Sequence, residues 1–178
     1  ELSLDGTLTP VLGALPAAMT AAEHHKGLLC PAACGAEAAW VGNTQVIAAA
    51  NLGDVVRHYT GQVPITPAEP GEVPLTAAGR DLREVKGQER AKRALEITAA
   101  GRHHLMLVGT PGSGKSMLAA RLPGILPPLT FDEALEVTAI HSVAGLLPPG
   151  AGLLTAPPFR APHHTASDVA VVGGGAVP

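Results

Sequence analysis

Aromatic side chains are nearly absent from this sequence. Phe, Trp and Tyr together make up 2% of its 178 residues. A hydrophobic core must therefore be built from alanine, leucine and valine, and small side chains each remove little apolar area from water, at about 25 cal/mol per Å². We expect modest stability for each folded part of the chain alone.

Cysteine and long apolar runs are also scarce. The cysteines are Cys30 and Cys34, and one C-x₃-C pair without a second ligand pair is a weak zinc signal, so a reduced cytosolic pair is predicted. No apolar run approaches the roughly 20 residues of a membrane helix, and no signal sequence opens the chain. We expect a cytoplasmic protein without membrane contact. Because it runs from Glu1 to Pro178 without an initiating Met, we interpret it as an internal fragment of a longer protein.

Charge is sparse too, since charged residues make up 15% of the chain and the formal net charge is −3. This balance argues against a general surface for polyanions. Basic residues nevertheless gather in one place, at Arg83, Lys86, Arg90, Lys92 and Arg93. A solvated helix face is the simpler interpretation of this basic cluster, with a contact to nucleic acid as the alternative.

The most informative feature that is present is a phosphate-binding pattern, G-x-x-x-x-G-K-[ST]. Its residues are Gly109, Thr110, Pro111, Gly112, Ser113, Gly114, Lys115 and Ser116. The glycines let the backbone turn tightly and approach anionic oxygens without a Cβ in the way, and a helix starting at about Gly114 points free N–H groups at the phosphates. Lys115 is placed to reach the β- and γ-phosphates of ATP, and the Ser116 hydroxyl to bind Mg²⁺.

The flanks of this pattern predict the context in which it works. Residues 104–108 form an apolar run of strand length, which predicts a strand buried on both faces of a sheet. Residues 117–122 predict a helix that stops at Pro123. Strand, glycine loop and helix is the context in which the motif binds a nucleotide. We therefore predict ATP and Mg²⁺ as ligands.

The first sixty residues predict a small α/β module, marginally stable alone. The expected elements are a hairpin at 2–8, a helix carrying alanines from 14 to 22, a strand at 28–30, a helix at 36–41, a strand at 45–49 and a helix capped by Asn51. The next residues, 61–80, are rich in proline and lack apolar periodicity. They predict an extended linker between domains.

The second part of the chain, residues 81–178, carries further helices around the phosphate loop. Ala91, Leu95 and Thr98 share one side of a predicted helix, and residues 130–133 predict a capping box at the start of another. Capping explains Asp132 and Glu133 better than a role as the acidic pair that handles Mg²⁺, because such a pair needs an apolar strand before it.

Histidines occur as adjacent pairs at 24–25, 103–104 and 163–164. Neighbouring histidines point in different directions, and no carboxylate stands at ligand spacing from them. Surface or subunit-contact histidines are therefore favoured over a metal site.

Three stretches together resemble one family. Val85-x-Gly87-Gln88, the phosphate loop, and residues 159–167 followed by Val172-Gly173-Gly174-Gly175 resemble the magnesium-chelatase-like AAA+ proteins of the competence type (the ComM/YifB family). Residues 1–60 are similar to the back part of the Lon-protease-like domain, of ribosomal S5 domain 2-like fold, that this family carries ahead of its ATPase. The resemblance implies an α/β protein in three parts. These are a partial Lon-like module (1–60), a proline-rich linker (61–80) and the N-terminal part of a P-loop AAA+ domain (81–178).

The same resemblance implies a function. The protein implied is an ATPase that assembles into a homo-hexamer and couples ATP hydrolysis to DNA remodelling or branch migration in recombination and natural transformation. The Ser–Lys pair of true Lon proteases has no counterpart, because the helix around residues 16–22 has no lysine, so peptidase activity is not expected. No acidic strand end, sensor residue or arginine finger follows the phosphate loop, so we expect no catalytic residue within the chain, and nucleotide binding with little hydrolysis. Two alternatives stay open: the ATPase subunit of a magnesium chelatase, and a truncated, non-hydrolysing nucleotide-binding module.

Overall fold

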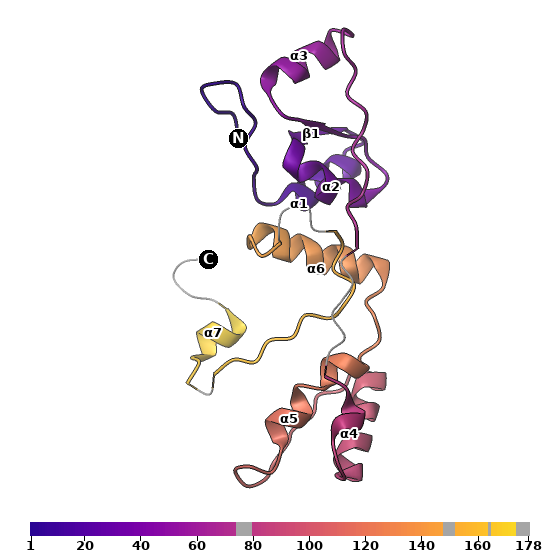
Figure 1. The fold of residues 1–178 in the computed structure, drawn as a ribbon, viewed down its shortest axis with the longest axis vertical. Helices are drawn as coiled ribbons and strands as arrows, with labels where there is room; N and C mark the ends of the chain where they lie inside the picture. Colours follow the sequence, from indigo (N-terminus) through magenta and orange to yellow (C-terminus); the bar gives the residue numbers. More distant parts are fainter. Residues whose placement is uncertain (74–79, 148–151, 164, 174–178) are drawn as a thin grey trace.

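Two short parallel strands organise the first part of the chain. The computed structural model describes residues 1–73, 80–147, 152–163 and 165–173 (Figure 1). Strand β1 (Leu28–Pro31) pairs in parallel with β2 (Val46–Ala49), with Leu28 opposite Val46. Parallel strands need a crossover connection. It consists of three short turns in place of the one predicted helix: η1 (Ala32–Cys34), α2 (Gly35–Ala38) and η2 (Ala39–Val41). The mixture of helices with a small parallel sheet is the expected α/β class.

Helix α1 (Ala14–Glu23) covers this sheet with small side chains, as the alanine spacing predicts. Ala14 and Ala18 are buried in one cluster with Cys30, Cys34, Ala38 and Val46. Because these side chains are small, the backbones of α2 and β2 lie close together. A Cβ at Gly35 would lie 2.5 Å from the Cβ of Ala48, so only glycine allows α2 to pack this near to β2.

Helix α3 (Leu52–Tyr59) begins where the sequence predicts. The side chain of Asn51 accepts a hydrogen bond from the backbone N–H of Asp54 at 2.9 Å, which satisfies a free donor of the first turn. The apolar face of the helix is not buried, however: Leu52, Val56 and Tyr59 are 46%, 54% and 69% exposed. The Asn51 cap therefore predicted the start of the helix correctly, and the structure leaves these three apolar side chains largely exposed.

The two segments without regular structure in this part are held by backbone hydrogen bonds. The predicted hairpin is reduced to a turn with one antiparallel bridge, between Leu2 and Leu8. Beyond α3, the described part of the predicted linker, residues 61–73, is extended but not detached. The backbone N–H of Ala68 donates to Val46 in β2, and that of Gly71 donates to Ala36.

A second apolar cluster forms around the phosphate loop. It contains Leu82, Val85, Leu95 and Leu118, which come from separate elements. These elements are η3 (Leu82–Glu84), α4 (Glu89–Gly101), α5 (Lys115–Ala119) and, packed against them, η4 (Leu122–Ile125). In α4 the buried residues are Leu95, Thr98 and Ala99, on the predicted side of the helix.

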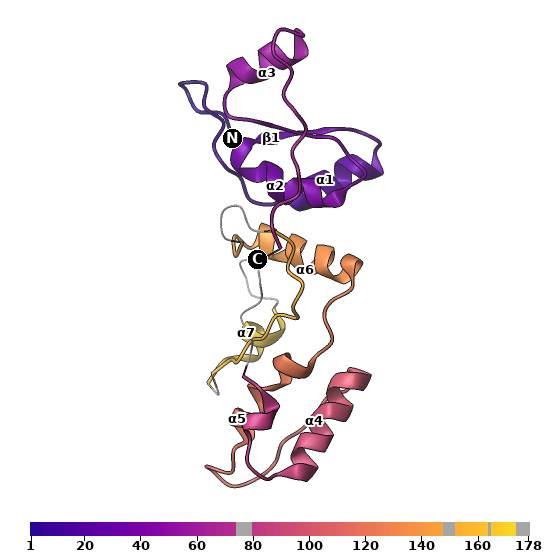
Figure 2. The ribbon, with the colours of Figure 1, turned by 45° about the vertical axis from the view of Figure 1, so that its right-hand side comes forward.

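Helix α6 (Phe131–Val143) lies between these two clusters in both views (Figures 1 and 2). It opens with the predicted capping box: Thr130 and Glu133 each bond the backbone N–H of the other. It packs against α1 of the first part, and its buried strip is Ala134, Thr138 and Ser142. The short helix α7 (Asp168–Val172) follows near the C-terminal end.

The strand predicted at residues 104–108 does not form. This segment is extended but irregular, and Leu105, Met106 and Val108 are 38%, 84% and 82% exposed. Only Leu107 packs against the second cluster. A strand requires a neighbouring backbone to pair with its N–H and C=O groups, and among the described residues no segment takes that place. The prediction of a doubly buried strand was therefore wrong for this structure.

Candidate functional site

The glycine-rich loop between Leu107 and α5 is folded tightly on itself. Gly112 and Gly114 have φ angles of 78° and 88°, in the left-handed region that glycine adopts without strain. A Cβ at Gly109 would lie 2.9 Å from the Oγ of Ser113. The three glycines predicted to matter are thus needed for two different reasons: backbone conformation at 112 and 114, and close approach at 109.

Lys115 sits in the curve of this loop. Its Nζ donates hydrogen bonds to the carbonyl oxygens of Gly109, at 2.8 Å, and Thr110, at 2.7 Å. The positive charge is therefore held beside the loop backbone, where an anionic group that enters the loop meets it at short range. Ser116 lies at the second position of α5 and is exposed, so its hydroxyl is open to solvent.

Helix α5 is shorter than predicted. It ends at Ala119, and Pro123 lies in the 3₁₀ turn η4 instead of marking the helix end. With only five residues, the helix adds few aligned peptide dipoles to the loop. The attraction for an anion must therefore come from the loop N–H groups and from Lys115. Leu118, which is 3% exposed, anchors the helix in the second cluster.

Gln88 is brought to the phosphate loop from a distant part of the sequence. It precedes α4 in a left-handed conformation with φ of 56°. Its side-chain Nε2 lies 3.1 Å from the position that a Cβ at Gly114 would take. The sequence motif that contains Gln88 carried the family resemblance, but no role in the site was predicted for it. Only the folded structure shows the contact.

Arg121 is a second residue whose part in the site the sequence did not reveal. It is 9% exposed and bonds three groups: the carbonyls of Asp81 and Met117, and the carboxylate of Glu84. The available signal was an arginine inside an otherwise apolar stretch, four residues after Met117 on a predicted helix. Such a position is normally buried, and a buried charge needs partners.

Glu133, one of the two carboxylates weighed as an acidic pair for Mg²⁺, has a structural role. Glu133 caps α6 and pairs with Arg102, whose Nη1 lies 2.5 Å from its Oε1. The hydrogen bond from Arg102, followed by those from the backbone and side chain of Thr130, lowers the pKa of Glu133 to about 2. The preference for capping over Mg²⁺ handling agrees with this geometry for Glu133.

The basic cluster is partly neutralised. Arg83 pairs with Asp81, Lys92 with Glu89, and Arg93 with Glu96, at 2.5, 3.1 and 2.9 Å. Lys86 and Arg90 make no ion pair with the described part of the chain. Arg90, Lys92 and Arg93 lie on α4, whereas Arg83 lies in η3 and Lys86 between the two elements, so only part of the cluster forms a helix face.

Metal-ligating residues do not gather anywhere in the described ranges: no group of three His, Cys, Asp or Glu side chains is placed to hold an ion. Cys30 and Cys34 are both buried and unbonded to each other. Of the histidine pairs, His164 lies outside the described residues. Over the same ranges, no helix has the length and apolar character needed to cross a bilayer.

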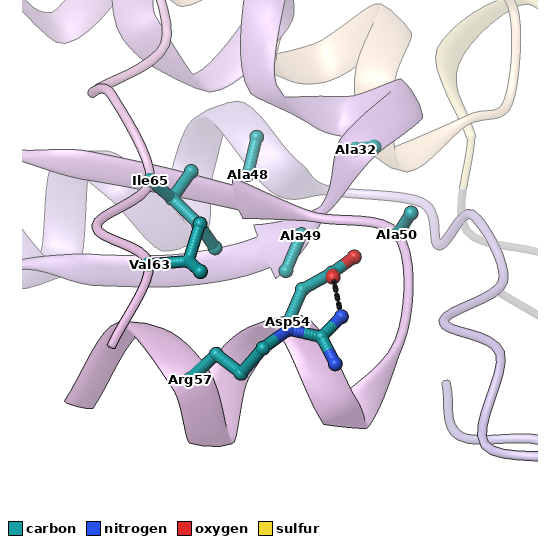
Figure 3. Close-up of a pocket in the computed structure, with 8 residues that line it drawn as sticks. All are labelled: Ala32, Ala48, Ala49, Ala50, Asp54, Arg57, Val63 and Ile65. Atoms are coloured by element: carbon teal, nitrogen blue, oxygen red, sulfur yellow. Dashed lines mark hydrogen bonds and ion pairs between the residues drawn. The ribbon is translucent and has the colours of Figure 1, made fainter. Parts of the chain in front are cut away.

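A small cavity of about 260 Å³ lies away from the phosphate loop, where β1 and β2 end and α3 begins (Figure 3). The side chains of Asp54 and Arg57, both from α3, form an ion pair of 2.6 Å at its side. Its lining residues are Ala32, Ala48, Ala49, Ala50, Asp54, Arg57, Val63 and Ile65. Alanine methyl groups dominate the lining, and none of the predicted site residues lies here.

Comparisons with known proteins agree with the resemblance. A sequence profile described as "Magnesium chelatase, subunit ChlI" matches residues 81–178. An uncharacterized protein of Mycobacterium tuberculosis strain H37Rv is 50% identical over 180 residues, covering 98% of this chain and 35% of that protein. The uncharacterized protein YifB of Salmonella typhimurium is 42% identical over 178 residues, and competence protein ComM of Haemophilus influenzae is 40% identical over 184. Both matches cover 100% of this chain. They cover 35% of YifB and 36% of ComM.

An archaeal Lon protease of Archaeoglobus fulgidus matches more locally, at 39% identity over 56 residues, which is 32% of this chain and 9% of that protein. The profile match and the similarity to competence protein ComM place the chain in the AAA+ class. Within it, the chain belongs to the magnesium-chelatase-like family of the competence type. It spans about a third of the length of the relatives that it matches along its whole length.

Proposed function

We propose that the chain binds ATP with Mg²⁺ at residues 109–116 and that the protein of which it is a part couples ATP hydrolysis to DNA remodelling. The observation that carries the nucleotide site is the loop itself. Two left-handed glycines shape it, a third allows close approach, and Lys115 holds its charge in the loop curve. These residues fit a nucleotide, because the chemistry required is a set of small residues, backbone donors and one cation around phosphate oxygens.

In this proposal Lys115 contacts the β- and γ-phosphates and the Ser116 hydroxyl binds Mg²⁺. The bound metal neutralises charge on the phosphates. Lys115 must exchange its present bonds to the carbonyls of Gly109 and Thr110 for bonds to phosphate oxygens, which accept from its Nζ as the carbonyls do. The chain supplies binding rather than hydrolysis.

Thermal unfolding of the chain with and without Mg-ATP tests the nucleotide site, with Lys115→Ala beside the wild type. Ligand at 100 times its Kd adds about 2.7 kcal/mol to the folded state, so we expect a higher Tm in the wild type and none of this gain in the variant. Lys115 belongs to neither apolar cluster, so the variant without ligand stays folded, with at most a small loss of Tm from the two missing bonds to the loop carbonyls. A cooperatively folded wild type that Mg-ATP leaves unshifted refutes the site.

The action on DNA and assembly into a homo-hexamer rest on the family. The relative named competence protein ComM supports this assignment. The local match to an archaeal Lon protease supports a partial Lon-like module, which we assign to residues 1–60, with the linker at 61–80. The test is ATP hydrolysis by the full-length protein with and without branched DNA. Stimulation and strand movement support a DNA motor, and indifference to DNA rejects it.

A second candidate is the ATPase subunit of a magnesium chelatase, favoured by the profile description over residues 81–178. The same ATPase assay separates the two functions. Stimulation by a porphyrin and its partner subunits, with no response to DNA, would favour the chelatase.

A further inference from the structure

We propose that Arg121 is a positioning residue that ties residues 81–88 to helix α5 and thereby holds Gln88 over the phosphate loop. The inference rests on the proposed nucleotide site and deepens it. It concerns a side chain that does not itself reach the loop.

The guanidinium of Arg121 uses three of its N–H groups on three different acceptors. Its Nε donates to the carbonyl of Asp81 at 3.1 Å, and its Nη1 to the carbonyl of Met117 at 3.0 Å. Its Nη2 donates to Oε2 of Glu84 at 2.9 Å. Met117 belongs to α5, Glu84 is the last residue of the 3₁₀ turn η3, and Asp81 directly precedes that turn. One rigid, planar group therefore joins two segments about 40 residues apart in the sequence.

Burial makes the three hydrogen bonds of Arg121 costly to break. The side chain of Arg121 is 10% exposed, whereas that of Glu84 is 55% exposed. A charge largely removed from water is costly without partners, so the arginine keeps its three bonds as long as α5 stays in place. The buried partner of this ion pair is therefore Arg121, and Glu84 is the partner that faces solvent.

The tied segment leads directly to the loop. Val85, next to Glu84, is 2% exposed and lies in the same cluster as Leu118 of α5. Gly87 and Gln88 then take left-handed conformations with φ of 65° and 56°. Only four peptide bonds separate Glu84 from Gln88, so a shift of the turn moves the glutamine. At the far end, the Nε2 of Gln88 lies 3.1 Å from where a Cβ at Gly114 would be, so the amide stands beside the loop.

Arginine is required here for its shape as well as its charge. A lysine has a single ammonium on a flexible stem and cannot address three acceptors spread around a plane. Arg121→Lys therefore keeps the charge and removes the joint. The matched control is Leu95→Val: Leu95 is 1% exposed in the same cluster, so the change loosens packing without touching any Arg121 bond. Glu84→Gln keeps a neutral acceptor and serves as the milder variant.

The first readout is amide hydrogen exchange of the 178-residue chain without ligand. We expect Arg121→Lys to speed exchange roughly tenfold at residues 85–90 and 112–118, relative to the rest of the chain. Leu95→Val loosens the cluster that contains Val85 and Leu118, so it should show a smaller local excess than Arg121→Lys, and so should Glu84→Gln. Equal local exchange in the arginine and leucine variants would overturn the proposal.

The second readout is the Kd of a fluorescent ATP analogue with Mg²⁺. We expect Arg121→Lys to raise it about tenfold and Leu95→Val to leave it within about twofold of the wild type. If the wild type binds the analogue and the two variants have the same Kd as each other, the proposal is also overturned. A folded wild type that does not bind, while the local exchange effect is present, refutes the nucleotide function and leaves the positioning role of Arg121 standing.

Discussion

The hydroxyl of Ser142 donates a hydrogen bond of 2.5 Å to the carboxylate of Glu37, which lies 105 residues earlier in the chain. The same hydroxyl accepts from the backbone N–H of Gly13 at 3.1 Å, and the same carboxylate oxygen accepts from that of Leu15 at 3.0 Å. These three bonds join the end of α6 to the start of α1. They attach the segment that follows the phosphate loop to the N-terminal α/β unit.

Ser142→Ala should lower the free energy of unfolding by roughly 1–3 kcal/mol. The change leaves the partly buried N–H of Gly13 without its acceptor, and an unsatisfied buried donor costs more than the net value of the bond. Urea unfolding at neutral pH measures the loss. Thr20→Ala is the control, because the exposed Thr20 hydroxyl bonds only Pro16 of its own helix, and we expect a change within about 0.5 kcal/mol. Equal losses in the two variants would contradict the role of Ser142.

Substituting the loop glycines separates conformational strain from contact. Gly112→Ala and Gly114→Ala both place a side chain at positive φ, at a cost of roughly 1–2 kcal/mol. At Gly112 the new methyl group meets nothing within 4 Å, whereas at Gly114 it meets Gln88 and Met117 at 3.1 and 3.2 Å. Chemical unfolding should therefore show a larger loss for Gly114→Ala. A larger loss for Gly112→Ala would mean that Gln88 does not lie where the structure has it.

Glu133 should make stability depend on acid. Its folded-state pKa of about 2 lies below the ordinary value of 4.5, so the carboxylate stabilises the fold above about pH 4.5, and this contribution is lost as the pH falls toward 2. The Tm gap between wild type and Glu133→Gln should therefore be widest near neutral pH and close near pH 2. Glu136→Gln, which removes an exposed carboxylate from the same helix, is the control. A gap for Glu133→Gln that stays constant with pH would argue against the Arg102 pair and the cap.

The two thiols should be inert in the folded chain. Burial, together with the nearby Cys34 and Glu37, raises the pKa of Cys30 to about 11, which leaves about one thiolate in a thousand at pH 8. Cys34 is 4% exposed. A thiol reagent that absorbs on reaction should label both cysteines quickly in concentrated urea and neither within the same time in buffer. Rapid labelling in buffer would show that the core around β1 opens easily.

Local signals in the sequence predicted much of the fold. Alanine spacing predicted α1, Asn51 predicted the start of α3, and the capping box at Thr130 predicted the start of α6, because each depends on contacts within one or two turns of chain. The strand at 104–108 failed for the opposite reason. Its apolar run describes what a strand would bury, but pairing requires another segment.

The candidate site divides in the same way. The positions and the glycine and lysine requirements of residues 109–116 could be stated from the pattern alone, and their role in binding ATP stays a prediction. The place of Gln88 beside Gly114 and the pairing of Arg121 with Glu84 could not be predicted, since each joins residues far apart in sequence. Spacing along one helix carries no information about such pairs.

The amino-acid sequence by itself determined the loop of three glycines and a lysine, the starts of α3 and α6 and the family, because these follow from local stereochemistry and residue type. The tertiary structure alone decided which faces are buried. Leu52, Val56 and Tyr59 stay exposed although their spacing is that of a buried face, while Ser142 and Thr138 are buried because each has a hydrogen-bond partner. Burial depends on what lies opposite a side chain, and that is known only once the chain has folded.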